Sequence, residues 1–243
     1  MKQIFVAAML FIFGAGQVLA ADLELPARPP IPPSNYYPVT QPVNWSGVYF
    51  GINGGYSVGN SAWSNAGVST GNFGTEGALV GGTLGVNYAD GLAGFLFGVE
   101  GDFDWSWLNG SSSVAACVGI GAPAGSACAT KSDWLITGRA RVGYVFNNFL
   151  IFGTGGAAST DFKVGLNPPG AFQSVTGPQL GWTAGGGIEY AFANYLTAKL
   201  EYLYLDFGTT SCPSGTTCGT LTAASVSRAE NIVRGGINYK FTW

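Results

Sequence analysis

The sequence predicts an eight-stranded antiparallel β-barrel of up-and-down topology that spans a membrane, and three observations lead to this fold class. The last stretch, Ile232 to Trp243, alternates large apolar side chains with glycine, polar and charged ones, which is the period of a strand with two different faces. Seven earlier stretches alternate in the same way. The connections between them are alternately short and long, as in transmembrane barrels.

The composition of the 243-residue chain is unusual for a soluble globular protein and sets the broad class. Charged residues make up only 9% of the chain, whereas aromatic residues reach 14% and there are 39 glycines. Past the N-terminal region no segment approaches 18 consecutive apolar residues, which disfavours membrane-spanning helices and favours strands. The formal net charge of −3 provides no basic surface for nucleic acid, so nucleic-acid binding is excluded.

The N-terminal region predicts export followed by a spacer. Residues 1–20 carry Lys2, an apolar run from Ile4 to Phe13 and small residues before Ala21, which is the pattern of a cleaved signal peptide. A retained helical anchor is the weaker alternative, because glycines interrupt the apolar run. Residues 21–44 contain seven prolines, which exclude a sheet ladder and favour an extended periplasmic leader. The barrel domain is expected over residues 45–243.

Strands are expected at eight places, and the C-terminal one should close the sheet. An open sheet would leave this long apolar strand as an exposed edge, so we expect it to pair with the first strand. The fifth stretch is rich in glycine and its facing is ambiguous. The expected stretches are 47–58, 78–88, 95–107, 134–146, 150–160, 180–190, 196–204 and 232–243.

The connections predict the orientation of the barrel. Short turns are expected at Asp90-Gly91, Asn147-Asn148 and Phe192 to Asn194. Long loops are expected at 59–77, 108–133, 163–178 and 208–228. Outer-membrane barrels place short turns in the periplasm and long loops outside the cell. With an even number of strands, both termini are then expected in the periplasm.

The volume of the apolar side chains decides which face of the strands points outward. A soluble barrel with an apolar interior is the competing fold, but eight strands enclose only enough space for small side chains. Trp105, Trp107, Trp134 and Trp182 with their apolar neighbours are too bulky for that interior, so the apolar face should contact lipid. Aromatic residues near strand ends are expected to form interfacial girdles. They are Tyr88, Trp107, Trp134, Tyr190 and Trp243.

The opposite face predicts a charge network inside the lumen. Its acidic and basic residues balance, and buried charges must be paired or hydrated. We expect an electrostatic plug; the alternative is an ion path in which water lies between the charges. The predicted members are Glu100, Asp102, Asp104, Arg139, Arg141, Glu189, Lys199, Glu201, Arg234 and Lys240.

Four cysteines occur as two close pairs in loops rich in small residues. In an exported protein we expect disulfides between Cys117 and Cys128 and between Cys212 and Cys218, each acting as a loop staple. The spacings do not match zinc ligands and the chain has no histidine, so no metal site is expected.

Several motifs, in order, resemble those of the small α-proteobacterial outer-membrane proteins called immunogenic or porin-like. This family belongs to the wider class that includes the transmembrane barrel of outer-membrane protein A. The resemblance covers essentially the whole chain after the signal peptide. It rests on an ADL start before the proline-rich leader, WSGVYFGINGGY (Trp45 to Tyr56), GVEGDFDWSW (Gly98 to Trp107), LEYLYLDFG (Leu200 to Gly208) and the terminal RGGINYKFTW.

The resemblance implies a Gram-negative outer-membrane surface antigen in contact with membrane lipid, periplasmic chaperones and the barrel-assembly machinery. It also implies that the machinery recognises the terminal aromatic strand, here Tyr239, Phe241 and Trp243. Family members usually end in phenylalanine, whereas this chain ends in Trp243.

The available chemistry argues against an enzyme and leaves two classes of function. The familiar hydrolytic sites of outer-membrane barrels use histidine as base, and this chain has none, so we expect no catalytic residues and no cofactor. The first class is a structural or porin-like barrel. The second is a surface-binding protein acting through its four long loops, with Trp63, Phe73 and Phe172 as candidate contacts for a host cell, an adhesion partner or haemin.

Overall fold

The computed structural model describes residues 43–89, 93–167, 173–174, 178–211 and 225–241 of the chain, and these form one antiparallel sheet with a short helix. Eight long strands make the wall: β1 (Gly47–Asn65), β3 (Phe73–Tyr88), β4 (Phe95–Ser111), β5 (Ala127–Phe146), β6 (Phe149–Thr160), β9 (Gln179–Ala191), β10 (Leu196–Ser211) and β11 (Ser225–Phe241). The smaller elements are β2 (Val68–Ser69), α1 (Val114–Gly119), β7 (Lys163–Asn167) and β8 (Gln173–Ser174).

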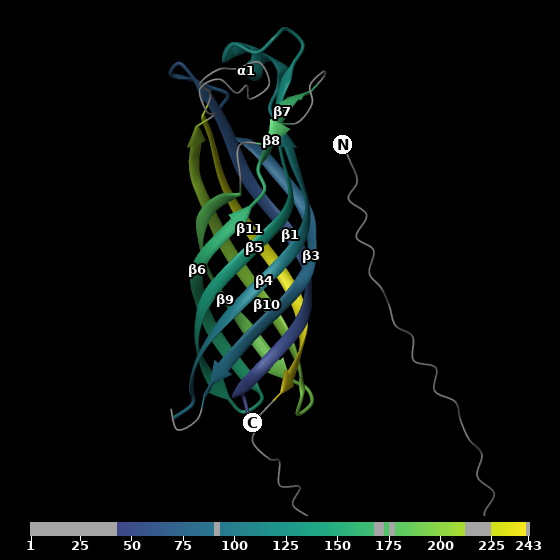
Figure 1. Cartoon of the computed structure of the whole chain (residues 1–243), viewed down its shortest axis with the longest axis vertical. Helices are drawn as coiled ribbons and strands as arrows, with labels where there is room; N and C mark the ends of the chain where they lie inside the picture. Colours follow the sequence, from purple (N-terminus) through teal and green to yellow (C-terminus); the bar gives the residue numbers. More distant parts are fainter. Residues whose placement is uncertain (1–42, 90–92, 168–172, 175–177, 212–224, 242–243) are drawn as a thin grey trace, which may run out of the picture. The chain divides into compact units, whose positions relative to one another are not determined.

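The eight long strands close into a barrel (Figure 1). Each pairs antiparallel with its neighbours in the order β4, β3, β1, β11, β10, β9, β6, β5, and β5 returns to β4. The expected pairing of the first and last strands is confirmed, because β1 and β11 pair from Val48 with Phe241 to Ser64 with Ser225. Closure leaves no long apolar edge. The predicted fold class is therefore confirmed.

The two ends of the barrel differ. At the turn end, Asn147 and Asn148 join β5 to β6, and residues 192–195 join β9 to β10. Asn147 has a φ of 53°, a left-handed conformation that asparagine tolerates well. The expected turn at Asp90-Gly91 lies outside the described residues. The opposite end, called here the loop end, carries α1, β2, β7 and β8 (Figure 1).

The strands run further toward the loop end than the sequence predicts. β1 continues to Asn65, β4 continues to Ser111 and β5 begins at Ala127, so parts of two expected loops are strand. Beyond the lipid the outer face of a barrel does not have to be apolar. The alternation on which the prediction relied therefore stops, while backbone pairing continues.

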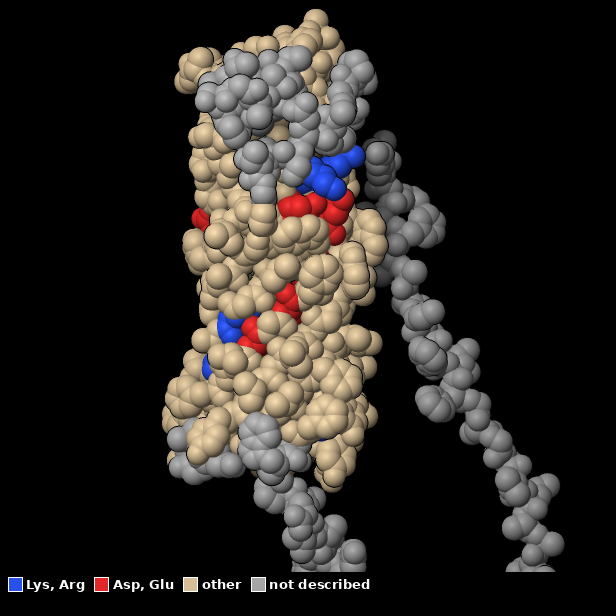
Figure 2. All heavy atoms as spheres, viewed as in Figure 1, with Lys and Arg blue, Asp and Glu red and all other residues tan. Residues whose placement is uncertain are grey.

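The apolar face of the barrel wall points outward. Ile52 is 70% exposed and Leu84 is 63% exposed, while their strand neighbours Asn53 and Thr83 are buried. In Figure 2 most of the wall is uncharged, and small groups of basic and acidic atoms are visible at mid-height and in its upper third. The ambiguous fifth stretch is resolved, because Leu150 is among the β6 side chains that point into the barrel.

Among the described residues, no helix has the length and apolar character needed to cross a membrane.

The interior is narrow enough to require glycine at some positions. At Gly85 on β3, a Cβ atom would collide with the phenol ring of Tyr49, the paired residue on the neighbouring strand β1. Glycine there makes room for the aromatic ring. This fits an interior that is filled by its own side chains.

An apolar cluster fills the loop end and contains the predicted disulfide between Cys117 and Cys128. Both cysteines are fully buried beside Trp63 and Phe162. The bridge therefore does more than staple a loop, because it ties α1 to β5 within packed apolar side chains. The expected Cys212–Cys218 pair lies outside the described residues.

Replacing both cysteines of this bridge with serine should loosen the loop end and leave the barrel folded. The bridge joins residues 11 apart in sequence, and its loss should reduce local stability by about 2 kcal/mol. Limited proteolysis should then cut residues 112–127 roughly thirty times faster, while the unboiled protein keeps its shifted mobility in detergent gels. Loss of the mobility shift would contradict this view and show that the barrel itself depends on the bridge.

Candidate functional site: the charged interior

Arg139 lies at the centre of a layer of charged side chains that crosses the barrel interior. It extends from β5, and its guanidinium donates to Glu201 on β10 (Nη1 to Oε1, 2.5 Å) and to Asp102 on β4 (Nη2 to Oδ2, 2.6 Å). It also pairs with Glu100, its neighbour across the β4–β5 ladder. One cation therefore connects strands on opposite walls.

Arg234 and Lys199 complete this layer. From β11, Arg234 reaches Glu201 at 2.9 Å and both Asp102 and Asp104 at 3.0 Å. Lys199 on β10 donates to both oxygens of Glu100, at 2.9 and 2.8 Å. Every carboxylate in the layer thus lies within ion-pair distance of at least one cation. We name this layer the central network; it consists of Glu100, Asp102, Asp104, Arg139, Lys199, Glu201 and Arg234.

A second cluster lies next to the central network, toward the turn end. Arg141 pairs with Glu189, and it also donates to the Tyr49 hydroxyl at 3.1 Å. Tyr49 in turn donates to Glu100 Oε2 at 2.6 Å, which links the two clusters. Asn238 donates to Glu189 at 3.0 Å. The central network and this second cluster therefore form one continuous hydrogen-bonded system, in which the members polarise one another.

Lys240, also expected in the lumen, has a different environment. Its ammonium group donates to the backbone carbonyl of Asn44 at 3.0 Å and lies 4.4 Å from the centre of the Trp45 ring. It therefore fastens the end of β11 to the residues that lead into β1.

The central network is buried within the barrel. The side chains of Arg139, Asp102 and Glu201 are 0% exposed, and those of Arg234 and Glu100 are 1% and 2% exposed. Apolar clusters lie on both sides. The one toward the loop end includes Leu203, Leu205, Phe207 and Ile232, and the one toward the turn end includes Leu96, Leu150 and Phe152.

Sequence reasoning missed three interior groups. Arg228 and Glu230 form a buried ion pair nearer the loop end, and the guanidinium lies 5.6 Å from the Phe162 ring and 5.3 Å from the Phe207 ring. The sequence does contain the pattern that marks this pair. Every second residue of this strand faces inward, and the pair continues that alternation from Arg234. Tyr49, the third group, lies on the predicted inward face of the first stretch.

The aromatic residues expected to contact a partner from exposed loops are not at loop tips where the structure describes them. Trp63 is 0% exposed and donates from Nε1 to Thr130 at 3.1 Å, so its expected position at a loop tip is wrong. The cause is the extension of β1, which turns this side chain into the barrel mouth. Phe73 is partly buried against the same cluster, and Phe172 lies outside the described residues.

Aromatic residues surround the outer wall near the turn end. Tyr239 and Phe241 of the terminal strand are exposed, and each ring centroid lies 5.7 Å from that of Phe50 on β1. Tyr88 and Tyr190 are also exposed, as is Trp107 near the loop end, whereas Trp134 is partly buried. Trp243 lies outside the described residues.

Comparison with known proteins agrees with this architecture. Residues 38–241 match the model of the outer membrane protein beta-barrel domain. The chain belongs to this family. It is 33% identical to the 31 kDa outer-membrane immunogenic protein of Brucella melitensis, over 99% of this chain and all of that protein. It is 31% identical to the 22 kDa outer membrane protein of Rhizobium leguminosarum, over 84% of this chain and 82% of that one.

A solved structure supports the fold alone. The outer membrane protein OprG of Pseudomonas aeruginosa superposes with a TM-score of 0.50 at 14% identity, over 81% of this chain and 98% of OprG. Together these comparisons confirm the resemblance found in the motifs. The protein is an integral β-barrel of the Gram-negative outer membrane, and the relatives described above are named as outer-membrane proteins rather than as enzymes.

Proposed function

We propose that this protein is a structural, non-catalytic barrel of the outer membrane whose lumen is closed to solutes. The burial of the central network carries the proposal. A water-filled path must expose the side chains that line it, whereas Arg139, Asp102 and Glu201 are 0% exposed. The apolar clusters on either side give two further barriers, because crossing a dry apolar layer costs an ion several kcal/mol.

The loop end faces the outside of the cell in this proposal, and both termini face the periplasm. The short turns and the longer, disulfide-bonded end fit the usual arrangement of outer-membrane barrels. Contact with periplasmic chaperones and the assembly machinery, through a terminal strand that includes Tyr239 and Phe241, belongs to the same proposal. The word immunogenic in the name of the Brucella relative supports exposure of one end to the exterior.

Porin-like passage is the alternative, and conductance separates the two. Refolded protein without its signal peptide should give no steady current in a planar lipid bilayer. Arg139→Ala and Glu201→Ala should remain silent as well, because the apolar clusters still close the lumen. Only preparations with the heat-dependent gel shift of a folded barrel should be measured. A steady wild-type conductance that changes in either variant would show a water path through the network and contradict the closed barrel.

A role in surface binding through exposed aromatic loop tips receives less support. Trp63, one of the three candidates, is inside the barrel mouth and is not available to a partner. Binding by the loop end would have to use other residues. A groove on the outer wall contains exposed polar and aromatic side chains that could serve.

A further inference from the structure

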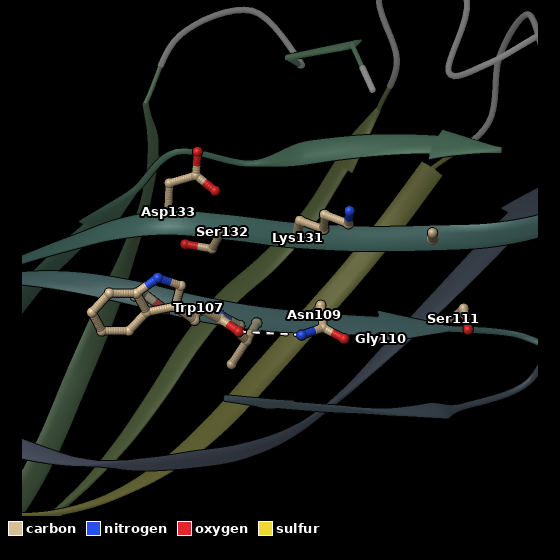
Figure 3. A pocket seen from close by; sticks show the side chains of 10 residues that line it. Trp107, Asn109, Gly110, Ser111, Lys131, Ser132 and Asp133 are labelled. Carbon is tan, nitrogen blue, oxygen red and sulfur yellow. Dashed lines mark hydrogen bonds between the residues drawn. The ribbon is translucent and has the colours of Figure 1, made fainter. Parts of the chain in front are cut away.

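A polar groove of about 490 Å³ lies on the outside of the barrel, between the loop-end parts of β4 and β5. Figure 3 shows Trp107, Asn109 and Ser111 in a row along β4, with Asp133, Ser132 and Lys131 along the neighbouring strand. The pairing of β4 with β5 changes register between Trp105 and Leu108. Such irregularities re-aim side chains and leave backbone groups unpaired, which makes them common at binding sites.

The groove offers both donors and acceptors in defined positions. The Asn109 side-chain amide donates to the Trp107 carbonyl at 3.2 Å, as marked in Figure 3, which fixes its orientation. Its oxygen remains an acceptor, and Ser111 adds a hydroxyl. The volume of the groove lies within the usual range of about 300–1,000 Å³ for small-ligand sites.

The charges around the groove are of both signs with an acidic excess, which argues against a site for a simple anion. Lys131 lies opposite Lys163 in the β5–β7 ladder, and Lys163 pairs with Asp133 and lies 3.5 Å from Asp161. Asp161 also accepts from the backbone N–H groups of Asp133 and Trp134, at 2.8 and 3.0 Å. Glu76 is exposed on β3 opposite Asn109 of β4, so two lysines stand against three carboxylates. A neutral ligand rich in hydroxyl groups can form hydrogen bonds with both the lysines and the carboxylates, because each hydroxyl donates and accepts.

The groove begins where the lipid-facing wall ends. Trp107 is 60% exposed at one side of it, and Trp105, 58% exposed, continues the apolar wall toward the turn end. An indole at such a boundary presents an apolar face while its N–H can reach polar groups. A ligand here would contact polar side chains and lie beside acyl chains.

We propose that this groove binds the saccharide headgroup of an outer-leaflet glycolipid, with Trp107 packing against a sugar ring and Asn109, Lys131 and Asp133 bonding its hydroxyls. The proposal rests on the orientation given under the proposed function, because only that orientation brings the groove to the sugar-bearing leaflet. It does not depend on whether the lumen conducts.

The test uses the refolded full barrel in detergent and two probes, intact lipopolysaccharide and the oligosaccharide released from it by mild acid. Calorimetric titration should show saturable binding of lipopolysaccharide and weaker binding of the oligosaccharide. Trp107→Ala and Asn109→Ala should each weaken lipopolysaccharide binding about tenfold. Trp182→Ala is the matched control, because Trp182 is 52% exposed on β9 away from the groove, and its affinity should equal that of the wild type.

Three results would overturn the proposal: no saturable binding, equal affinity in the wild type and the two groove variants, or equal affinity for both probes, which would exclude the glycolipid as occupant. The gel-mobility shift verifies that each variant is folded. Binding in detergent is independent of membrane orientation and conductance. A negative titration from a folded, silent barrel therefore refutes the groove assignment and leaves the structural function intact.

Discussion

Replacing Arg139 with methionine should lower the free energy of unfolding by about 3–5 kcal/mol, because it leaves the buried carboxylates of Glu100, Asp102 and Glu201 short of a cation. Methionine keeps much of the side-chain length but cannot neutralise or hydrogen-bond a carboxylate. Urea unfolding of the protein in phospholipid vesicles, followed by tryptophan fluorescence, measures the change.

A matched control separates lost charge pairing from a general effect of substitution on this strand. Ala140, the next residue on β5, faces outward, so Ala140→Met introduces the same side chain into lipid and should change the stability by less than about 1 kcal/mol. The combined change Arg139→Met with Glu201→Gln should cost less than the sum of the two single changes, because the two side chains share one contact. Strict additivity would mean that this ion pair contributes little and that the plug is held by packing.

The inward face of the strands could be predicted from the sequence, but the partners within it could not. Alternation places Arg139 and Glu201 on the inside because lipid demands an apolar side chain at every second position. Which inward residues meet depends on the register of all eight strand pairs. Arg139 and Glu201 are 62 residues apart and meet across the lumen, whereas Lys240, on the same face, donates to the Asn44 carbonyl and lies over the Trp45 ring.

The sequence was least informative where the lipid constraint ends. At the loop end the outer face no longer has to be apolar, so no alternation marks the continuing strands. Trp63 was therefore expected in an exposed loop, although β1 carries it into the barrel mouth. Arg228 was expected in a loop for the same reason. The groove at Trp107 was equally hidden, because it depends on a register change between β4 and β5.

An arginine at Ile52 should reduce stability by about 2–4 kcal/mol, whereas an arginine at Asn60 on the same strand should change it by less than about 1 kcal/mol. Both side chains point outward from β1, but Ile52 is 70% exposed in the middle of the apolar wall, and Asn60 lies eight residues further toward the loop end. The difference arises because lipid cannot solvate a guanidinium, while the headgroups and water near the loop end can.

The same pair of variants tests whether the apolar outer face of the barrel contacts lipid. In detergent-free phospholipid vesicles, equilibrium unfolding should give the large difference between Ile52→Arg and Asn60→Arg. Equal, small effects at both positions would be the behaviour of an apolar wall in contact with water or with a soluble partner, and would refute a lipid-facing belt centred near Ile52. A large effect at Ile52 alone fixes the depth of β1 in the membrane. It also leaves the residues beyond Asn60 on β1, and those paired with them, as the part of the barrel that projects beyond the lipid.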